Sequence, residues 1–323
     1  MTDLSIIIVC YKGWERLIKC LEALSLFSGG SFKAEVIVVD NKSGEETIFK
    51  IQERFTKFRF IFNEINGGFA NGCNLGAKYA EGDFLLFLNP DTIVAESEVQ
   101  KLLNTAKVNP EYSIVSCKQV NEYGKESIAY GTFPSSFNLT GFQRAIFRNR
   151  INQSSSNLPE ISFPDWVSGS VILIKKETYR RMEGFDEDFW MYYEDVDLCR
   201  RVRNNGGEVA FCRNIFIEHN HGGSSRIDLK TTSLTKCEVL ISRHVYISKH
   251  LTGYNKFLIQ SFLVLNNLIS GFILAFVGLL LFFIRGLISR TLLFSRLIRY
   301  YTESVLRLSW ISPRSVNSVK PRF

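Results

Sequence analysis

Leu4-Ser-Ile-Ile-Ile-Val-Cys10 and Val36-Ile-Val-Val-Asp40 are short apolar runs rich in β-branched residues, a composition typical of buried strands. An amphipathic segment from Trp14 to Leu26 separates them. The three segments therefore predict a strand, a helix and a second strand. Such a connection joins parallel strands and lays its helix against the sheet.

The same alternation continues along the chain. It predicts helices around Glu45 to Phe55, Asn71 to Ala80, Lys176 to Met182 and Glu194 to Asn205, and strands at Phe58 to Phe62, Phe84 to Leu88, Val167 to Ile174, Glu208 to Phe211 and Ile215 to Ile217. The polar and aromatic stretch from residue 118 to residue 164 is interpreted as a long loop insertion. The expected fold class is α/β, with a mostly parallel sheet flanked by helices on both faces.

The C-terminal part of the chain differs in composition. The stretch from Phe257 to Ile284 has no charged residue over 28 residues, against the roughly 20 that span a bilayer. The chain beyond it carries the whole formal net charge of +7, which favours anionic lipid over nucleic acid as a partner. Residues 285–310 mix Arg with large apolar side chains, as a basic interfacial helix does. We expect a globular domain at residues 1–250 and a membrane-associated helical region at residues 251–323.

Two alternatives remain for this region. Gln260, Asn266, Asn267 and Ser270 interrupt the first half of the apolar stretch, so it could be re-entrant, as a shallow hairpin, rather than spanning. The basic residues alone could be solvated helix faces. Seven Cys without a CxxC pair, and an apolar run at Ile6 to Cys10 with no basic region before it, predict reduced thiols and no secretory signal, hence a cytosolic body.

Motifs for two common nucleotide-binding folds are missing. No GxGxxG follows the first strand and no GxxxxGK[ST] occurs, which disfavours dehydrogenases and P-loop proteins. Ligands of open α/β sheets bind beyond the carboxyl ends of the strands. The residues in that position are Tyr11, Asp40, Asn66 to Phe69 and Asp91.

Each of these strand ends has a functional and a structural interpretation. Asp40 could accept a hydrogen bond from a base or a ribose, or could simply form a turn. The run Asn66-Gly67-Gly68-Phe69 could offer backbone N–H groups to anionic oxygens, or be a tight loop. Asp91, held by Pro90 after a buried strand, suits a hard divalent cation, but could instead cap a following turn.

The densest signal lies between Gly184 and Arg201. Six acids fall between Asp186 and Asp197 and alternate with aromatic residues, which resembles a sugar-binding wall beside a base. Trp190, Tyr193 and Glu194 are candidates for binding an acceptor.

Three further residues around this segment are assigned roles. Asp195, in the first turn of a helix that favours its ionised form, suits a general base. Asp197 and Arg201 are expected to pair structurally. His219, before a Gly-rich turn, could bind metal or diphosphate or be structural.

Taken in order, five motifs carry a family resemblance. They are Ser-Ile-Ile-Ile-Val-Cys-Tyr11, Val-Val-Asp40-Asn-Lys-Ser, Asn66-Gly-Gly-Phe-Ala with Asn74, Asn89-Pro-Asp91, and Tyr-Glu194-Asp-Val-Asp-Leu with the later His219-x-x-Gly222-x-Ser224. Over about residues 4 to 225 the chain resembles the family 2 glycosyltransferases, inverting enzymes of the GT-A fold, most closely bacterial rhamnosyltransferase-like members.

The resemblance implies roles for individual residues. Tyr11 and Asp40 would contact the nucleotide, and Asn66, Gly67, Gly68 and Phe69 would border the donor. Asp91 and His219 would hold Mg²⁺ or Mn²⁺, and Asp195 would be the base. Asn89 stands where the family's DxD pattern has an acid, so it would bond a ribose hydroxyl instead and a two-carboxylate metal clamp is not expected.

The resemblance also implies a reaction and a place. A hexosyl group, expected to come from dTDP-L-rhamnose, would pass by single displacement to a lipid-linked or polysaccharide acceptor during O-antigen or capsule synthesis. The enzyme would sit at the cytoplasmic face of the inner (plasma) membrane, with lipids and no nucleic acid as partners. A nucleotidyltransferase would need a basic Gly-rich loop where Cys10-Tyr11-Lys12-Gly13 stands, and a membrane-anchored glycan-binding scaffold would not need both Asp91 and Asp195. Oligomeric state is not predicted.

Overall fold

The computed structural model describes residues 2–135, 139, 159–220, 229–281 and 285–318. The chain divides into two compact units, which are described separately. The sheet unit comprises Met1–Phe133, Asn157–Asp186 and Glu194–Ser224, and the helical unit comprises Pro134–Ser156, Glu187–Tyr193 and Ser225–Phe323. The functional division at residue 250 stays a prediction.

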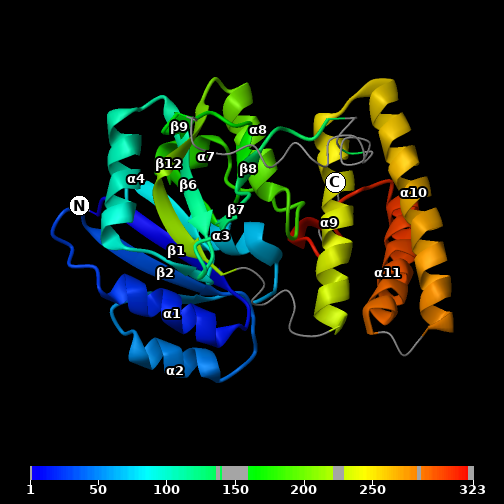
Figure 1. The fold of residues 1–323 in the computed structure, drawn as a ribbon, viewed down its shortest axis with the longest axis horizontal. Coiled ribbons are helices and arrows are strands. Elements are labelled where there is room, and N and C mark those ends of the chain that lie inside the picture. The colour runs from blue at the N-terminus through cyan, green and yellow to red at the C-terminus, as the bar shows by residue number, and fades with distance from the viewer. Residues whose placement is uncertain (1, 136–138, 140–158, 221–228, 282–284, 319–323) are drawn as a thin grey trace. The chain divides into compact units, whose positions relative to one another are not determined.

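The sheet unit alternates strands and helices along its sequence (Figure 1). Its elements are β1 (Leu4–Cys10), α1 (Trp14–Ser25), β2 (Ala34–Asp40), α2 (Thr47–Arg54), β3 (Arg59–Phe62), α3 (Gly68–Tyr79), β4 (Phe84–Leu88), β5 (Thr92–Ile93), α4 (Glu96–Val108), β6 (Tyr112–Val120), β7 (Glu126–Ser127), β8 (Tyr130–Gly131), β9 (Ile161–Ser162), β10 (Trp166–Val167), β11 (Val171–Lys175), α7 (Lys176–Arg181), α8 (Glu194–Asn204) and β12 (Glu208–His219).

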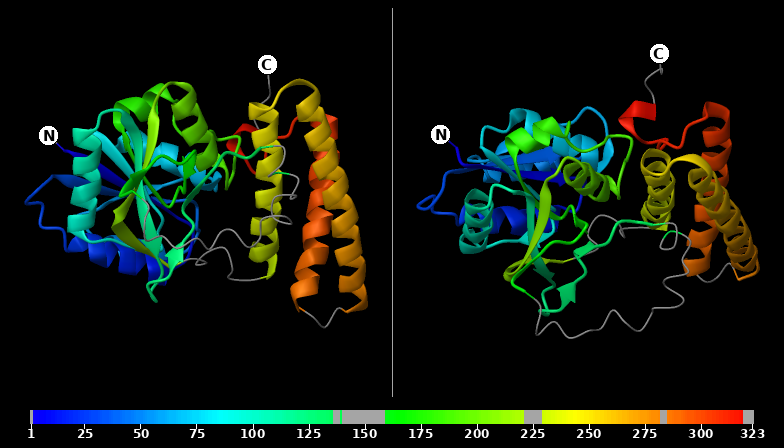
Figure 2. Two further views of the ribbon diagram at one scale, coloured as in Figure 1. Left: turned by 45° about the horizontal axis from the view of Figure 1, so that its top comes forward. Right: turned by 90° about the horizontal axis from the view of Figure 1, so that it is seen from above.

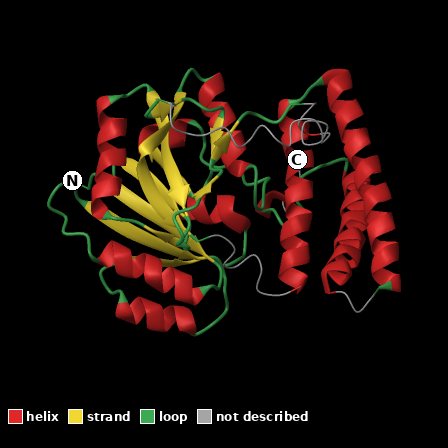
Figure 3. Cartoon of the chain, viewed as in Figure 1, coloured by secondary structure: helices red, strands yellow, loops and turns green. Residues whose placement is uncertain are grey.

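One mixed sheet organises this unit (Figure 3). Its main strand order is β3-β2-β1-β4-β11-β6-β12-β5, and β8 and β10 form a separate small sheet. β1 pairs in parallel with β2 and with β4, so their carboxyl ends meet at one edge. β11 is antiparallel to both of its neighbours, β4 and β6. The α/β fold class expected from the alternation is confirmed.

Alternate side chains of each strand bury against opposite layers of helices. Ile6 and Ile8 belong to the core formed with α1, α2 and α4, whereas Ile7 and Val9 belong to the core formed with α3, α7 and α8. Burial on both faces explains why β1 is a continuous apolar run rather than an alternating one. It also places functional groups at the strand ends, the part of this sheet not covered by helices.

Several boundaries differ from the sequence-based expectation. α3 begins at Gly68 instead of Asn71, because Gly68 can adopt a φ of 85° at the helix start. The strand expected from Val167 to Ile174 is broken at Ser168–Ser170. Residues 208 to 219 form a single strand with a register shift rather than two strands. The expected loop region from residue 118 instead begins inside β6.

The helical unit consists mainly of three long helices, α9 (Leu229–His250), α10 (Gly253–Leu280) and α11 (Arg285–Arg307), with a short 3-10 turn, η3 (Val316–Ser318). α11 lies beside both α9 and α10 (Figure 2). α10 is one unbroken helix, so the apolar stretch does not fold back on itself within its described residues. Among the described residues α10 is the one helix long and apolar enough to cross a membrane.

Two polar residues of α10 form hydrogen bonds to other helices of the helical unit. The Nε2 of Gln260 donates to the carbonyl of His244 at 3.0 Å, and the Nδ2 of Asn267 donates to the hydroxyl of Tyr301 at 2.8 Å. Leu265, Phe272 and Phe276, by contrast, are more than half exposed. Two of the four polar interruptions, Gln260 and Asn267, therefore belong to contacts between helices, whereas Asn266 and Ser270 are exposed. An apolar face of α10 is left uncovered.

Candidate active site

The ends of β1 and β2 are tied together by their loops. Asp40 is buried, and both of its carboxylate oxygens accept the N–H of Ser43, at 3.3 and 3.2 Å. The N–H of Lys12 donates to the hydroxyl of Ser43 at 3.0 Å, and the Nζ of Lys12 pairs with Glu45 at 3.0 Å. Asp40 therefore forms the turn that sequence alone left as an alternative. Tyr11 is 40% exposed at the same edge.

An asparagine network braces the loop that enters α3. The Nδ2 of Asn41 donates to the Oδ1 of Asn66 at 3.2 Å and to the carbonyl of Gly68 at 2.9 Å. The Nδ2 of Asn63 donates to Asn41 at 2.9 Å and to Asn71 at 2.8 Å. Sequence analysis singled out Asn66 to Phe69 but missed Asn41 and Asn63. The pattern used for Asp40 and Asp91 could have identified them as well, because Asn41 and Asn63 each directly follow a strand.

Asp91 and His219 meet beyond the ends of β4 and β12. The Oδ1 of Asp91 lies 3.2 Å from the Nε2 of His219, and the Nδ2 of Asn89 lies 3.5 Å from that nitrogen. The guanidinium of Arg16, on α1, approaches the Oδ2 of Asp91 at 3.5 Å. The structure thus brings the predicted Asn89, Asp91 and His219 together and adds Arg16, which sequence reasoning missed. His221, Gly222 and Ser224 lie outside the described residues.

The fit of this pair to a divalent cation follows from the partners of His219. The buried Gln119 accepts at its Oε1 from the Nδ1 of His219 at 2.7 Å and from the hydroxyl of Ser170 at 2.8 Å. Because that oxygen only accepts, Nδ1 carries the proton, and in the neutral ring Nε2 presents a lone pair to Asp91. A cation could lie between this lone pair and the carboxylate, whereas a protonated ring would pair with Asp91 directly. A ligating His held by an acceptor on its other nitrogen is the usual arrangement in metal sites.

Asp195 lies in the first turn of α8 and is fixed by backbone donors. Its Oδ2 accepts the N–H of Gly169 at 2.8 Å, and its Oδ1 accepts the N–H of Val196 at 2.8 Å. Burial raises the pKa of Asp195, and these two hydrogen bonds oppose that rise only in part. Desolvation therefore outweighs the helix terminus that was expected to favour ionisation. A carboxylate with a raised pKa is the stronger general base.

The Ser168–Ser170 turn connects the two parts of the site. The N–H of Gly169 donates a hydrogen bond to Asp195, and the hydroxyl of Ser170 donates to Gln119, which in turn accepts from His219. A Cβ at Gly169 would lie 3.3 Å from the ring of Phe69 and 3.4 Å from the Cβ of Asp195, so the donor-side loop approaches the same turn. The sheet unit therefore gathers Phe69, Asp91, His219 and Asp195 around one short turn between β10 and β11.

Glu194 is the first residue of α8. Its side chain is buried in the sheet unit, and burial followed by the negative charge of Asp195 raises its pKa well above the usual range. Its charge also raises the pKa of the Cys73 thiol, on α3, although burial is the larger cause there. Its Oε2 has no hydrogen-bond partner within the described residues. Its assignment to acceptor binding stays a prediction.

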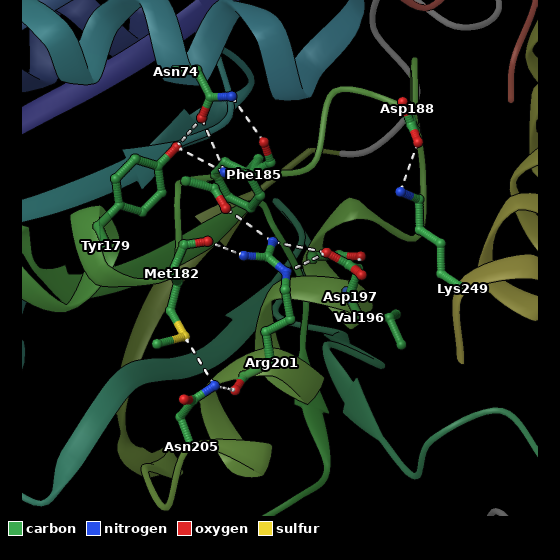
Figure 4. Close-up of polar contacts among 12 residues, drawn as sticks. Asn74, Tyr179, Met182, Phe185, Asp188, Val196, Asp197, Arg201, Asn205 and Lys249 are labelled. Carbon is green, nitrogen blue, oxygen red and sulfur yellow. Dashed lines mark hydrogen bonds and ion pairs between the residues drawn. The ribbon is translucent and has the colours of Figure 1, made fainter. Parts of the chain in front are cut away.

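Two further sets of hydrogen bonds fix α8 and the chain at Gly184 and Phe185 that precedes it (Figure 4). Arg201 pairs with Asp197 at 2.7 Å, as expected, and also donates to the carbonyl of Gly184 at 2.9 Å. Asn74, on α3, accepts the N–H of Phe185 at 3.0 Å and donates to its carbonyl at 2.8 Å. These bonds fix the chain on the N-terminal side of the segment that leads to Asp195.

Residues 5–161 match the family described as Glycosyl transferase family 2, and residues 153–222 match the one described as N-terminal domain of galactosyltransferase. The chain carries a family 2 glycosyltransferase domain. The predicted family and enzyme class are confirmed.

Named relatives agree with this family, and a solved structure shares the fold. The low-salt glycan biosynthesis hexosyltransferase Agl10 of Haloferax volcanii is 28% identical over 68% of this chain and 68% of its own length. The N-acetylglucosaminyl-diphospho-decaprenol L-rhamnosyltransferase of Mycobacterium tuberculosis is 25% identical over 71% of this chain and 80% of its own. The crystal structure of GalNAc-T7 with UDP, GalNAc and Mn²⁺ shares the fold, with a TM-score of 0.54 and 16% identity over 77% of this chain and 50% of that one.

Two of the predicted acceptor residues of this glycosyltransferase lie in the helical unit. Trp190 is buried with the guanidinium of Arg314 3.9 Å from its ring centroid. Tyr193 packs against Tyr246 of α9, with ring centroids 5.7 Å apart. They therefore belong to a different unit from Asp195, although only one residue of sequence separates Tyr193 from Asp195. Their role in acceptor binding stays a prediction.

Proposed function

We propose that this glycosyltransferase moves a sugar, with inversion, from a nucleoside-diphosphate sugar to a hydroxyl of a lipid-linked glycan at a membrane surface. The observation that carries the proposal is the turn at Ser168–Ser170. At one end its backbone donates to the desolvated carboxylate of Asp195, and at the other it contacts the glutamine that orients His219 beside Asp91, the pair proposed to bind a cation. A base and a cation site held by one rigid turn are the parts that an inverting sugar transfer needs.

The residues divide the reaction between them. Asp195 takes the proton of the acceptor hydroxyl as its oxygen attacks C1 of the sugar opposite the diphosphate, so the configuration inverts. Asp91 and His219 would hold Mg²⁺ or Mn²⁺, which offsets the charge gathered on the departing diphosphate. Arg16, beside Asp91, adds a fixed positive charge on the same side. Tyr11 and Asp40 lie at the neighbouring strand ends, where the nucleotide is proposed to bind.

The donor and acceptor classes rest on the relatives and on the helical unit. Rhamnose is the proposed sugar because a relative is named an L-rhamnosyltransferase, and the same name specifies a diphospho-decaprenol acceptor. A lipid-linked acceptor presents its sugar close to the head groups, where an enzyme held by α10 would meet it. Synthesis of a cell-surface glycan on the cytoplasmic side is the setting we propose.

The direct test is turnover of the purified full-length protein with a panel of nucleotide sugars, Mn²⁺ and a polyprenyl-diphosphate glycan in detergent. We expect dTDP-L-rhamnose to be consumed with release of nucleoside diphosphate and formation of a glycolipid. Release of pyrophosphate from a nucleoside triphosphate and a sugar phosphate would instead identify a nucleotidyltransferase. Nucleotide binding without turnover of any donor would favour the glycan-binding scaffold.

Membrane association is expected to depend on the exposed apolar face of α10. Replacing Leu265 and Phe272 with Arg should weaken sedimentation with anionic vesicles by at least ~50-fold, because an Arg at the centre of an apolar helix costs roughly 2.5–3.5 kcal/mol on insertion scales. Vesicle co-sedimentation measures this. The matched control is Leu26→Arg, at an exposed leucine of the sheet unit, which should bind like wild type. Unchanged sedimentation of the double variant would remove α10 as the anchor.

A further inference from the structure

The segment Glu187–Tyr193, called here the bridging loop, joins Asp186 to the catalytic helix α8 but belongs to the helical unit. The chain thus leaves the sheet unit and returns to it immediately before Glu194 and Asp195. The bridging loop is therefore held by the helical unit and continues directly, along the sequence, into α8.

The chain beyond α11 forms most of these contacts. Residues 312–317, called here the tail clamp, follow the last long helix and approach the start of the bridging loop. The hydroxyl of Ser315 donates to the carbonyl of Glu187 at 2.5 Å, and the N–H of Ser312 donates to the carbonyl of Asp188 at 3.3 Å. The Nδ2 of Asn317 donates to the carboxylate of Asp188 at 2.9 Å. Ser312 and Ser315 are buried, so these bonds are shielded from water.

Two charged side chains, one from the tail clamp and one from α9, also contact the bridging loop. The guanidinium of Arg314 lies over the buried ring of Trp190, 3.9 Å from its centroid. The Nζ of Lys249, at the end of α9, pairs with Asp188 at 2.7 Å (Figure 4). The carboxylate of Asp188 therefore has partners from both α9 and the tail clamp, which ties the bridging loop to two separate segments of the helical unit.

The end of the bridging loop has a strained backbone. Tyr192 and Tyr193 have φ values of 72° and 69°, in the left-handed region that bulky residues rarely adopt. Such a conformation persists only where the surroundings impose it. Here the hydroxyl of Ser242 donates to the carbonyl of Met191 at 2.8 Å, and the ring of Tyr193 packs against Tyr246. Two successive left-handed residues turn the chain directly into the first turn of α8.

We propose that the tail clamp positions the bridging loop for transfer to the acceptor, with Arg314 and Asn317 as positioning residues for the catalytic reaction. This inference rests on the proposed function, because it assigns the bridging loop to the acceptor side of the base. The chain after the last long helix would then contribute to catalysis by positioning the bridging loop. The helical unit then supplies both the apolar face of α10 and the contacts that hold the segment immediately before Glu194 and Asp195.

The test compares the double variant, Arg314→Ala combined with Asn317→Ala, with the control Arg299→Ala. The Arg299 side chain is exposed on α11 and pairs with Glu303 of the same helix. Two readouts are taken on the full-length protein in detergent. Hydrogen–deuterium exchange of the peptide covering residues 186–194 reports on the bridging loop. Steady-state kinetics with the polyprenyl-diphosphate glycan, and nucleoside diphosphate binding, report on function.

We expect exchange in that peptide to be at least ~10-fold faster in the double variant, and the acceptor KM to rise at least ~10-fold, with nucleotide binding unchanged. Arg299→Ala should match wild type in hydrogen–deuterium exchange, in acceptor KM and in nucleotide binding. Arg314→Lys keeps a cation over Trp190 and should restore most of the acceptor KM. The single variant Asn317→Ala, which removes one hydrogen bond, should shift both readouts in the same direction if the double variant folds poorly.

Two results would overturn the proposal: exchange equal to that of Arg299→Ala, or faster exchange with an unchanged acceptor KM and kcat. The proposed function fails separately, through a wild-type protein that transfers no sugar. In that event the exchange measurement still tests the clamp. Faster exchange of the peptide in the double variant than in wild type supports the clamp, and equal exchange in the two proteins refutes it.

Discussion

Asp195→Asn is expected to lower kcat for sugar transfer by about 10²–10⁴-fold, the usual contribution of a general base, while nucleotide binding persists. The amide keeps the shape of the carboxylate and one acceptor oxygen for the Gly169 N–H, so α8 should stay folded. What is lost is the basic oxygen that removes the acceptor's proton. Release of nucleoside diphosphate, with and without acceptor, measures the effect.

The control for this variant is Asp83→Asn, at an exposed aspartate directly before β4 and thus at the opposite end of that strand from Asn89 and Asp91, which should be fully active. The pH profile adds a second readout. Because burial raises the pKa of Asp195, the base form is populated only above that raised value. Activity of the wild type should therefore rise with pH through an apparent pKa above the ordinary aspartate value and fall below it. A variant that retains more than about a tenth of wild-type kcat would exclude Asp195 as the base.

Asp91→Asn is expected to weaken Mn²⁺ binding in the presence of nucleoside diphosphate by at least ~100-fold. The substitution removes the carboxylate charge of the proposed ligand, and even residues that merely orient metal ligands typically contribute 10–100-fold. Transfer activity should fall by at least as much, because the departing diphosphate loses its charge compensation. Isothermal titration with Mn²⁺ measures the affinity directly and independently of turnover.

The comparison for this variant is again Asp83→Asn, which should titrate like wild type. High Mn²⁺ concentrations should restore part of the activity of Asp91→Asn if its defect is metal affinity. Wild-type affinity in Asp91→Asn would mean that Asp91 instead serves as the partner of Arg16, and that the cation, if required, is held elsewhere.

Sequence periodicity determined the α/β fold because its cause is local. Strands buried on both faces must be continuous apolar runs, and helices that cover them must be amphipathic, so β1, α1 and β2 follow from their own residues. The carboxyl ends of parallel strands necessarily meet at one edge, which made Tyr11, Asp40 and Asp91 candidates before any contact was known. Asp195 was identified in the same way, from its place at the start of an amphipathic helix.

The partners of those candidates were decided by the tertiary structure. Gln119 holds His219 across 100 residues, and Arg16 reaches Asp91 across 75, so no local pattern marks either one. The pKa of Asp195 rises through burial that only folding creates.

The bridging loop shows the limit most clearly. Its acids and aromatic residues are predicted to line an acceptor site, and that role stays a prediction. What no local pattern indicated is that Asp188 binds Asn317, 129 residues away, and that Arg314 lies over Trp190. Side chains determine strands and helices through their neighbours in sequence. Which of them touch ligand and which brace the fold depends on contacts between segments that sequence order leaves far apart.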